Sequence, residues 1–330
     1  MSSRDRDWDG ARLHVVTGKG GTGKTTVAAA LALALAAEGG RVLLVEVEGR
    51  QGIAPLFGVP PLSYEERRVA AAGRGEVRAL SVDAEEALVE YLDLFHGLRR
   101  AAGALRRFGA VDFVTAIAPG ARDVLLTGKV SEAVRRRSRP GGPHVYDAVV
   151  LDAPPTGRIA RFLDVTAAVS GLARVGTVRD HADQVREVVH SAETVVHFVT
   201  LLEEMPVQEC LDGIAELRAL GLNVGGVLVN KVRPALLEDS VLTAAAGGVV
   251  DVDALARGLQ AAGLPEPDGL ARRLSGEVVE HARHVRMERE ARERLAAAAR
   301  PCYDVALLEE GVDLAGLHRL AESLRAQGAV

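Results

Sequence analysis

The stretch Thr17-Gly18-Lys19-Gly20-Gly21-Thr22-Gly23-Lys24-Thr25-Thr26 decides the fold of this 330-residue chain. It fits the pattern G-x-x-x-x-G-K-[ST], in which backbone N–H groups cradle nucleotide phosphates. An apolar run, Leu13–Val16, precedes it, and a run rich in Ala and Leu, 26–38, follows it and stops at Gly39-Gly40. The sequence therefore predicts a buried strand, a glycine-rich turn and a helix, which is the context that the motif requires.

The motif assigns a chemical role to the side chains of the loop. We expect Lys24 to neutralise the β- and γ-phosphates and the Thr25 hydroxyl to bind Mg²⁺. Only four of the 40 basic residues are lysines, and Lys19 and Lys24 are two of them. A chain that otherwise uses Arg keeps Lys where a compact ammonium is needed, so Lys19 is predicted to act chemically. The predicted nucleotide-binding residues of the loop are Gly18, Gly20, Gly21, Thr22, Gly23, Lys24, Thr25 and Thr26.

The rest of the chain alternates apolar runs with segments of helical periodicity. This pattern predicts an α/β fold, a P-loop NTPase with a mostly parallel central sheet and helices on both faces. We expect one domain over 1–330, with a helical insert at 83–137 and a second helical excursion at 235–300. Further strands are predicted at 41–48, 77–82, 146–152, 195–201, 224–230 and 303–308, and further helices at 156–167, 207–220 and 314–325.

Polar residues recur where these predicted strands end, which is where open α/β sheets bind ligands. Glu46 and Glu48 end one strand, Asp152 ends another, and Asn230 ends a third. We expect Asp152 to hold Mg²⁺ through water opposite Thr25, and Glu48 to polarise the attacking water. The alternatives are a helix-capping Asp152 and a solvated Glu48. The predicted catalytic set is Lys19, Lys24, Glu48 and Asp152.

Asn230 opens the sequence Asn230-Lys231-Val232-Arg233. GTPases use N-K-x-D in such a place, and the Asp reads the guanine amino group. Arg233 stands where that Asp would be, so we expect Asn230 to contact adenine. A simple strand-end cap is the alternative for this side chain.

Composition excludes several classes of protein. The net charge of −5 and the pI near 6.0 argue against a nucleic-acid-binding surface. The longest apolar run, 27–37, is too short to cross a bilayer, and no signal peptide opens the chain, so we expect a cytoplasmic protein without a direct membrane anchor. Cys210 and Cys302 are far apart in the sequence and form no C-x-x-C pair, which argues against a structural zinc site.

Three separated motifs resemble the deviant-Walker-A ATPases, and within them the arsenical-pump and tail-anchored-protein-targeting (Get-like) branch. The loop 18–26 is similar to the signature-lysine loop of that branch, and Asn230 to its adenine-contacting asparagine. Glu209 is similar to a glutamate that starts a helix. The second switch is matched by Asp152, Pro155, Thr156, Gly157, Arg161 and Leu163. Within this branch the chain looks most like the paired Get-like subunits of actinobacteria.

This resemblance implies an enzyme that uses ATP, ADP and Mg²⁺ and hydrolyses ATP to ADP and phosphate. It implies a dimer in which Lys19 reaches into the partner's site and stabilises the transferred phosphoryl group. The nucleotide state would control dimer closure and contact with another protein. The implied partner is a paralogous Get-like subunit or a second copy of this chain, with a protein client.

The chain departs from the branch at three points. The first switch has the form D-P-A-H, whereas this chain has Glu48-Gly49-Arg50-Gln51. Because a longer side chain displaces the carboxylate, we expect hydrolysis that is slow or depends on a partner. The thiols that clamp zinc or sense metalloid are missing, so we expect no stimulation by arsenite. A methionine-rich client groove is disfavoured, since the chain has three methionines.

Two other functions stay open at this point. One is a non-hydrolysing, nucleotide-binding regulatory subunit of a heterodimer. The other is a partition or division ATPase, which needs a membrane-seeking helix or a DNA-binding surface. The last predicted helix has Leu314, Leu317, Leu320 and Leu324 on one face and few basic residues, so we expect it to cover the sheet.

Overall fold

The computed structural model describes residues 8–47, 49–94, 121–164, 176–234 and 236–330. Their centre is an eight-stranded sheet in the order β3-β4-β2-β5-β1-β6-β7-β8. Every neighbouring pair is parallel except β3 and β4, which are antiparallel. The strands are β1 (Leu13–Gly18), β2 (Arg41–Val47), β3 (Arg67–Ala72), β4 (Gly75–Val82), β5 (Ala148–Asp152), β6 (Thr194–Thr200), β7 (Val224–Val232) and β8 (Cys302–Ala306). The predicted α/β fold with a mostly parallel sheet is confirmed.

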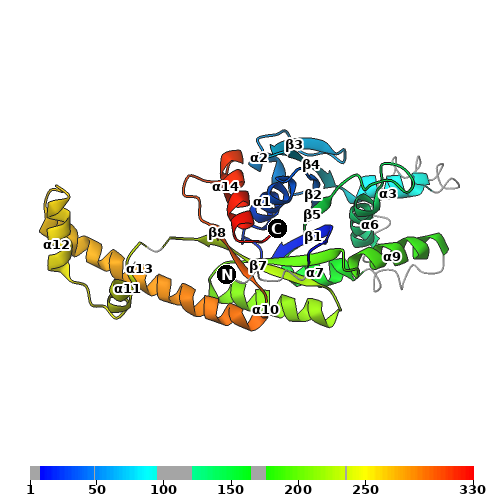
Figure 1. Ribbon diagram of the computed structural model, residues 1–330. Helices are drawn as coiled ribbons and strands as arrows, with labels where there is room; N and C mark the ends of the chain where they lie inside the picture. Colours follow the sequence, from blue (N-terminus) through cyan, green and yellow to red (C-terminus); the bar gives the residue numbers. More distant parts are fainter. Residues whose placement is uncertain (1–7, 48, 95–120, 165–175, 235) are drawn as a thin grey trace.

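Helices cover both faces of the sheet (Figure 1). One core lies under α1 and α14, and the other lies under α6, α7, α9 and α10. Leu317, Leu320 and Leu324 are buried against the first face, so the last helix covers the sheet as predicted, whereas Leu314 at its start is 37% exposed. The helices are α1 (Lys24–Ala36), α2 (Ile53–Leu56), α3 (Ala84–Leu94), α6 (Ala121–Arg135), α7 (Thr156–Leu163), α9 (Gly176–Val189), α10 (Glu204–Ala219), α11 (Asp239–Ala246), α12 (Val252–Ala261), α13 (Pro267–Leu295) and α14 (Leu314–Ala326).

Alternation along the strands decides which side chains meet α1. On β2, Val42 and Leu44 belong to the core beneath α1, while Leu43 and Val45 belong to the core on the opposite face. Successive side chains of a strand point to opposite faces. Glu46 therefore continues the series that faces α1.

Strand β3 was not predicted from the sequence. Its residues, Arg67–Ala72, are mostly Arg and Ala, which have little strand preference. This segment becomes a strand because it pairs with β4. A tight turn with Gly73 at φ 54° folds the chain back so that the two strands meet. The chain there passes so close to α1 that a Cβ at Gly73 would lie 2.3 Å from the carbonyl oxygen of Ala37.

The described parts of the predicted insert at 83–137 are the helices α3 and α6, and the predicted break at Pro119-Gly120 lies outside the described residues. Lys129 of α6 donates to both carboxylate oxygens of Glu90 on α3, at 2.8 and 2.9 Å. Its ammonium also lies 5.0 Å from the ring centroid of Tyr64. The third lysine of the chain therefore joins the two helices to the segment before β3.

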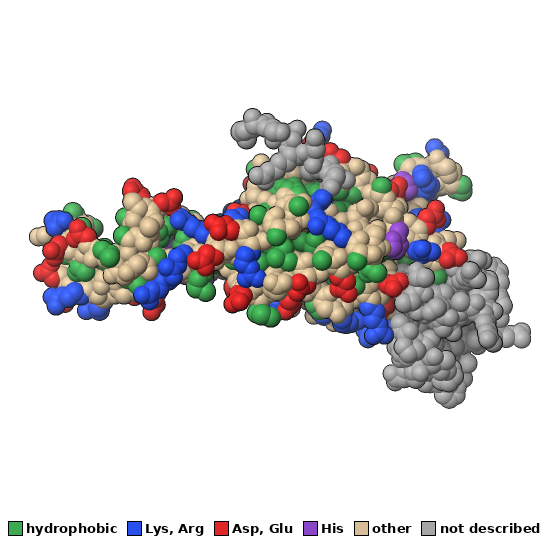
Figure 2. All heavy atoms as spheres, turned by 90° about the horizontal axis from the view of Figure 1, so that it is seen from below, with side chains coloured by type: hydrophobic (Ala, Val, Ile, Leu, Met, Phe, Trp, Pro, Cys, Tyr) green, Lys and Arg blue, Asp and Glu red, His purple; other side chains and the backbone are tan. Residues whose placement is uncertain are grey.

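The second excursion forms an arm, which we define as α11, α12 and α13. Figure 1 shows α13, 29 residues long, leaving the body with α11 and α12 beside its far part. Leu242, Ala245 and Ala282 form a small core of the arm's own. Figure 2 shows acidic, basic and apolar side chains interleaved along it. Over the described ranges, no helix is long and apolar enough to cross a membrane.

Candidate functional site

The phosphate loop connects β1 to α1, as predicted, and two of its glycines have no room for a side chain. A Cβ at Gly18 would lie 2.1 Å from the carbonyl oxygen of Val199 on β6. Gly23, at φ 87°, precedes the first residue of α1, and a Cβ there would lie 2.3 Å from Nδ2 of Asn230. Only glycine fits both positions, so the neighbouring strands fix the shape of the loop.

The two lysines of the loop lie in different surroundings. Lys24 is buried, and its ammonium donates to the carbonyl oxygen of Lys19 at 3.2 Å. The Lys19 side chain is 32% exposed, and its ammonium pairs with Glu209 of α10 at 2.7 Å. The other Glu209 oxygen lies 3.4 Å from the hydroxyl of Thr156, which begins α7. Glu209 lies inside α10, which begins at Glu204, three residues before the predicted start at 207.

Thr25 and Asp152 come together as predicted. The Thr25 hydroxyl donates to Asp152 Oδ2 at 2.6 Å. Burial raises the pKa of Asp152 to about 6, although the Thr25 hydroxyl and Lys24 favour its ionised form. The Thr17 hydroxyl donates to the carbonyl oxygen of Pro154 at 2.7 Å and so ties the end of β1 to the segment after Asp152.

A second carboxylate lies at this edge of the sheet. Glu46 of β2 pairs in register with Asp152 of β5 and is only 1% exposed. Its Oε1 accepts the backbone N–H of Gly52 at 2.5 Å. Burial raises its pKa, and the backbone N–H groups of Gly52, Ile53 and Gln51 act in the opposite direction. From the sequence alone, Glu46 is recognisable as a residue at a strand end but has no assigned role. Its even spacing from Val42 and Leu44 was the signal that it faces α1.

We call Thr25, Glu46 and Asp152 the acidic corner. Glu46 Oε2 and Asp152 Oδ1 are both buried and find no hydrogen-bond partner among the described residues. No group of three His, Cys, Asp or Glu side chains in the described ranges could hold a metal. A hydroxyl and two carboxylates nevertheless fit Mg²⁺, which takes one or two carboxylates, keeps several waters and binds nucleotide phosphates.

Asn230 contacts the loop directly. Its Nδ2 donates to the carbonyl oxygen of Thr22 at 2.7 Å, and its Oδ1 accepts the backbone N–H of Lys231 at 2.9 Å. Contact with adenine stays a prediction. The hydrogen bond to Thr22 joins the end of β7 to the phosphate loop.

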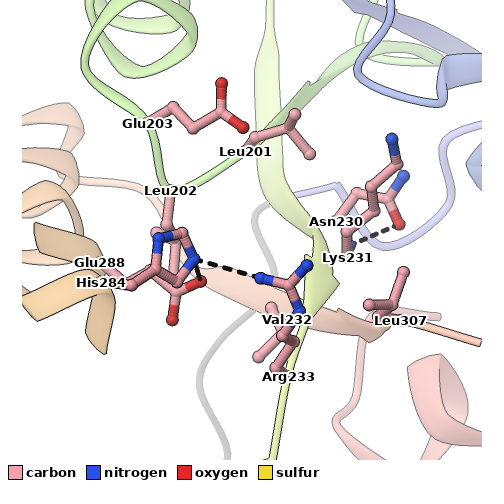
Figure 3. A pocket seen from close by; sticks show the side chains of 10 residues that line it. All are labelled: Leu201, Leu202, Glu203, Asn230, Lys231, Val232, Arg233, His284, Glu288 and Leu307. Carbon is pink, nitrogen blue, oxygen red and sulfur yellow. Dashed lines mark hydrogen bonds and ion pairs between the residues drawn. The ribbon is translucent and has the colours of Figure 1, made fainter. Parts of the chain in front are cut away.

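Beside Asn230 lies a cavity of about 280 Å³ at the carboxyl ends of β6, β7 and β8 (Figure 3). Arg233, at the position of the guanine-reading Asp, turns toward α13 and lies 3.2 Å from His284. His284 in turn lies 3.0 Å from Glu288. The arm therefore forms one wall of this cavity. The cavity is lined by Leu201, Leu202, Glu203, Asn230, Lys231, Val232, Arg233, His284, Glu288 and Leu307.

Within the described residues, the fold gathers Lys19, Lys24, Thr25, Asp152 and Asn230 around one loop. Glu48, the predicted water-activating residue, lies outside the described residues. A buried ammonium, a hydroxyl beside a carboxylate and a glycine turn at a helix N-terminus can together hold phosphate and a divalent cation.

Comparison with known proteins agrees with this geometry. Residues 11–192 match the family model described as anion-transporting ATPase. The chain belongs to the anion-transporting ATPase family. It is 54% identical to ATPase BagA of Mycobacterium tuberculosis over 320 residues, which cover 97% of this chain and 94% of the relative.

More distant members of the anion-transporting ATPase family are also similar. A putative arsenical pump-driving ATPase of Aquifex aeolicus is 27% identical over 269 residues, covering 68% of this chain and 64% of its own. ATPase GET3 of Kluyveromyces lactis is 29% identical over 168 residues, covering 49% and 47%. As a member of the family, the chain is an ATP-hydrolysing enzyme.

Proposed function

We propose that this anion-transporting ATPase family member works as a dimer whose closure is controlled by ATP, and that Lys19 of each subunit acts in the site of the other. The main support for this proposal is the contrast between the two lysines of the loop. Lys24 is buried against its own loop, whereas Lys19 is one-third exposed and paired with Glu209. A partly exposed ammonium beside a nucleotide cradle is available to a second chain once it leaves Glu209.

Within one subunit, Lys24 would bind the β- and γ-phosphates of ATP, while Thr25 and Asp152 would hold Mg²⁺. The metal would neutralise charge on the phosphates. The cavity beside Asn230 adjoins the loop and is a suitable place for the adenine base, since Arg233 stands where GTPases have their guanine-reading Asp. The support for this arrangement is the contact of Thr25 with Asp152 and of Asn230 with Thr22.

We further propose that hydrolysis is slow, or depends on a partner, because Glu48 replaces the shorter Asp of the first switch. The partner is a paralogous subunit or a second copy, and a protein client is a further candidate. The arm supports contact with another protein, since it leaves the body and exposes Val241 of α11 and, between its helices, Val249 and Leu264. These side chains are 44%, 68% and 44% exposed.

The test is ATP turnover per subunit measured over a range of protein concentrations, together with the mass of the assembly with and without ATP. We expect turnover per subunit to rise with concentration as the dimer forms. Lys19→Ala should lower turnover by about 1,000-fold, because a charge supplied in trans stabilises the phosphoryl group. Lys19→Ala should still bind nucleotide.

Lys129→Ala is the matched control, since it removes a lysine that contacts Glu90 and is remote from the loop. Its turnover per folded subunit should equal that of the unmodified chain. Turnover that does not depend on concentration, with full activity in Lys19→Ala, would contradict the role of Lys19 across the dimer.

A further inference from the structure

Glu46 and Asp152 form an unusual pair at the acidic corner. They are opposite each other in the register of β2 and β5, and both continue the side-chain series that faces α1. Glu46 is 1% exposed and Asp152 is 7% exposed. Two neighbouring carboxylates removed from water repel each other, and burial without a cation is costly.

The hydrogen bonds of Glu46 and Asp152 use one oxygen of each carboxylate and leave the other oxygen without a partner among the described residues. Asp152 uses Oδ2 for the Thr25 hydroxyl, and Glu46 uses Oε1 for the Gly52 N–H. Asp152 Oδ1 and Glu46 Oε2 are buried without a hydrogen-bond partner in the ranges that the structure describes. A buried polar atom without a partner calls for a ligand, an ion or a water.

The surroundings of Glu46 connect it to Thr25 as well. A Cβ at Gly52 would lie 3.4 Å from Glu46 Oε1 and 3.6 Å from Thr25 Oγ1. Gly52 therefore lies close to both the carboxylate and the hydroxyl. Glu46 thus holds the segment after β2 against the first residues of α1.

We propose that Glu46 is a second carboxylate of the Mg²⁺ site and binds the water shell of the nucleotide-bound cation together with Asp152. This proposal rests on the proposed binding of ATP with Mg²⁺. Glu46 thereby links the cation to Gly52, the residue that follows Glu48-Gly49-Arg50-Gln51, so that Mg²⁺ binding fixes the end of the first switch. Glu46 is a positioning residue, because it acts through the water shell and through the Gly52 backbone.

The experiment uses the full chain and a fluorescent ADP analogue, titrated with Mg²⁺ at constant pH. In the unmodified chain, Mg²⁺ should tighten ADP binding. In Glu46→Gln, the Mg²⁺ concentration that gives half of this effect should rise about 10-fold, as is usual when an outer-shell metal partner is lost. The affinity for ADP in EDTA should be unchanged. Mn²⁺ titrated in place of Mg²⁺, and followed by its electron paramagnetic resonance signal, should show the same shift.

Asp147→Asn is the matched control, since Asp147 accepts the N–H of Arg41 at 2.7 Å at the opposite ends of the same two strands. It should leave the Mg²⁺ midpoint unchanged. Thermal unfolding supplies a second measurement. Because Glu46→Gln removes one of two neighbouring buried charges, its melting temperature in EDTA should equal or exceed that of the unmodified chain, and the gain on adding Mg²⁺ and ADP should shrink.

The outcomes separate the two proposals. An unmodified chain that binds no ADP would refute the proposed function. An unmodified chain that binds ADP with a clear Mg²⁺ effect, together with an unshifted midpoint in Glu46→Gln, would refute the role of Glu46 alone. A Glu46→Gln chain that melts earlier in EDTA, or fails to fold, would also refute it, because the carboxylate would then be structural.

Discussion

The two sides of the phosphate loop are built differently. On the inner side, Lys24 and Asp152 are buried, Thr25 is partly buried, and the three contact one another or the loop backbone. On the outer side, Lys19 and Glu209 form an ion pair whose side chains are 32% and 36% exposed. Buried groups in fixed positions suit a ligand that every subunit holds, and exposed groups suit a contact that forms and breaks. One short loop therefore combines a fixed phosphate site with a movable charge.

The largest effect should come from the inner side. Lys24→Ala should lower kcat/KM for ATP by about 10⁴-fold, because both phosphate binding and stabilisation of the transition state lose a buried ammonium. Binding of fluorescent ADP should be lost at the same time. Lys129→Ala should leave both quantities unchanged. Tight ADP binding in Lys24→Ala would remove the distinction between the two sides.

The next effect tests whether the outer side acts on another subunit. Lys19→Ala and Asp152→Asn should each be nearly inactive when purified alone. If the chain pairs with itself, a mixture should regain activity, since a mixed dimer combines an intact site with a partner's Lys19. Random exchange makes about half of the dimers mixed, and each mixed dimer has one complete site out of two. About a quarter of the full activity is therefore expected.

The measurement is the turnover of an equimolar mixture after subunit exchange. A mixture of Lys19→Ala with Lys19→Arg serves as the control and should regain no activity beyond that of its parents. If the mixture of Lys19→Ala and Asp152→Asn stays inactive while mixed dimers are seen by mass, Lys19 acts within its own subunit, and the contrast between inner and outer sides has another cause.

Much of the fold and of the inner side could be predicted from the sequence. Local signals in the sequence predict the order of the elements. These signals are the glycine pattern, the helix after it and the apolar strands. The approach of Thr25 to Asp152 followed from the meeting of strand ends at one edge. Strand β3, Arg67–Ala72, was missed because pairing with β4, and not its own composition, makes it a strand.

The missed parts of the site depend on contacts between distant segments. Glu46 and Glu48 both end a strand in the sequence, and only the register of β2 with β5 distinguishes Glu46 as the neighbour of Asp152. Likewise, the sequence singled out Lys19 but could not show that Glu209, 190 positions later, holds it. The contact of Asn230 with the Thr22 carbonyl also joins segments far apart in the chain.

A third prediction concerns acid, which should lower the stability of the fold that carries both sides of the loop. The loop ends β1, and His14 of β1 stacks on His197 of β6 at a centroid distance of 5.4 Å. Burial lowers the pKa of His14 to about 4 and that of His197 well below its usual value. Trp8 lies edge-on to His197, and Arg300 lies over Trp8, so charge on the pair is further disfavoured.

Because the unfolded chain titrates near pH 6.5 and the folded chain lower, the unfolded state takes up protons first. Stability is therefore fully present above about pH 6.5 and falls toward pH 4, by about 1.4 kcal/mol for His14 alone at pH 5.5. Denaturant unfolding at pH 7.5 and 5.5 measures this. His14→Phe should reduce the loss, and a stability that is constant over this range would show that the pair does not couple folding to protons.

The smallest effect should come from releasing Lys19. Glu209→Gln removes the charge that holds the ammonium but keeps the side chain's size, and a partly exposed ion pair contributes up to about 1 kcal/mol. If Lys19 must leave Glu209 to enter the partner's site, the ATP-dependent dimer should tighten by up to about fivefold for each Lys19 that is released. The dissociation constant of the dimer, measured with ATP and Mg²⁺ by sedimentation, gives this value.

Glu38→Gln is the matched control, because Glu38 forms a surface ion pair with Arg325 away from the loop. It should leave the dimer unchanged. Whether Glu209→Gln tightens or weakens the dimer shows which role Glu209 has. A weaker dimer would mean that Glu209 assists closure, either by orienting Lys19 toward the partner or by holding Thr156 of α7. In that case the outer side of the loop would be a prepared contact surface, as fixed as the inner side, and exposure alone would not distinguish the two lysines.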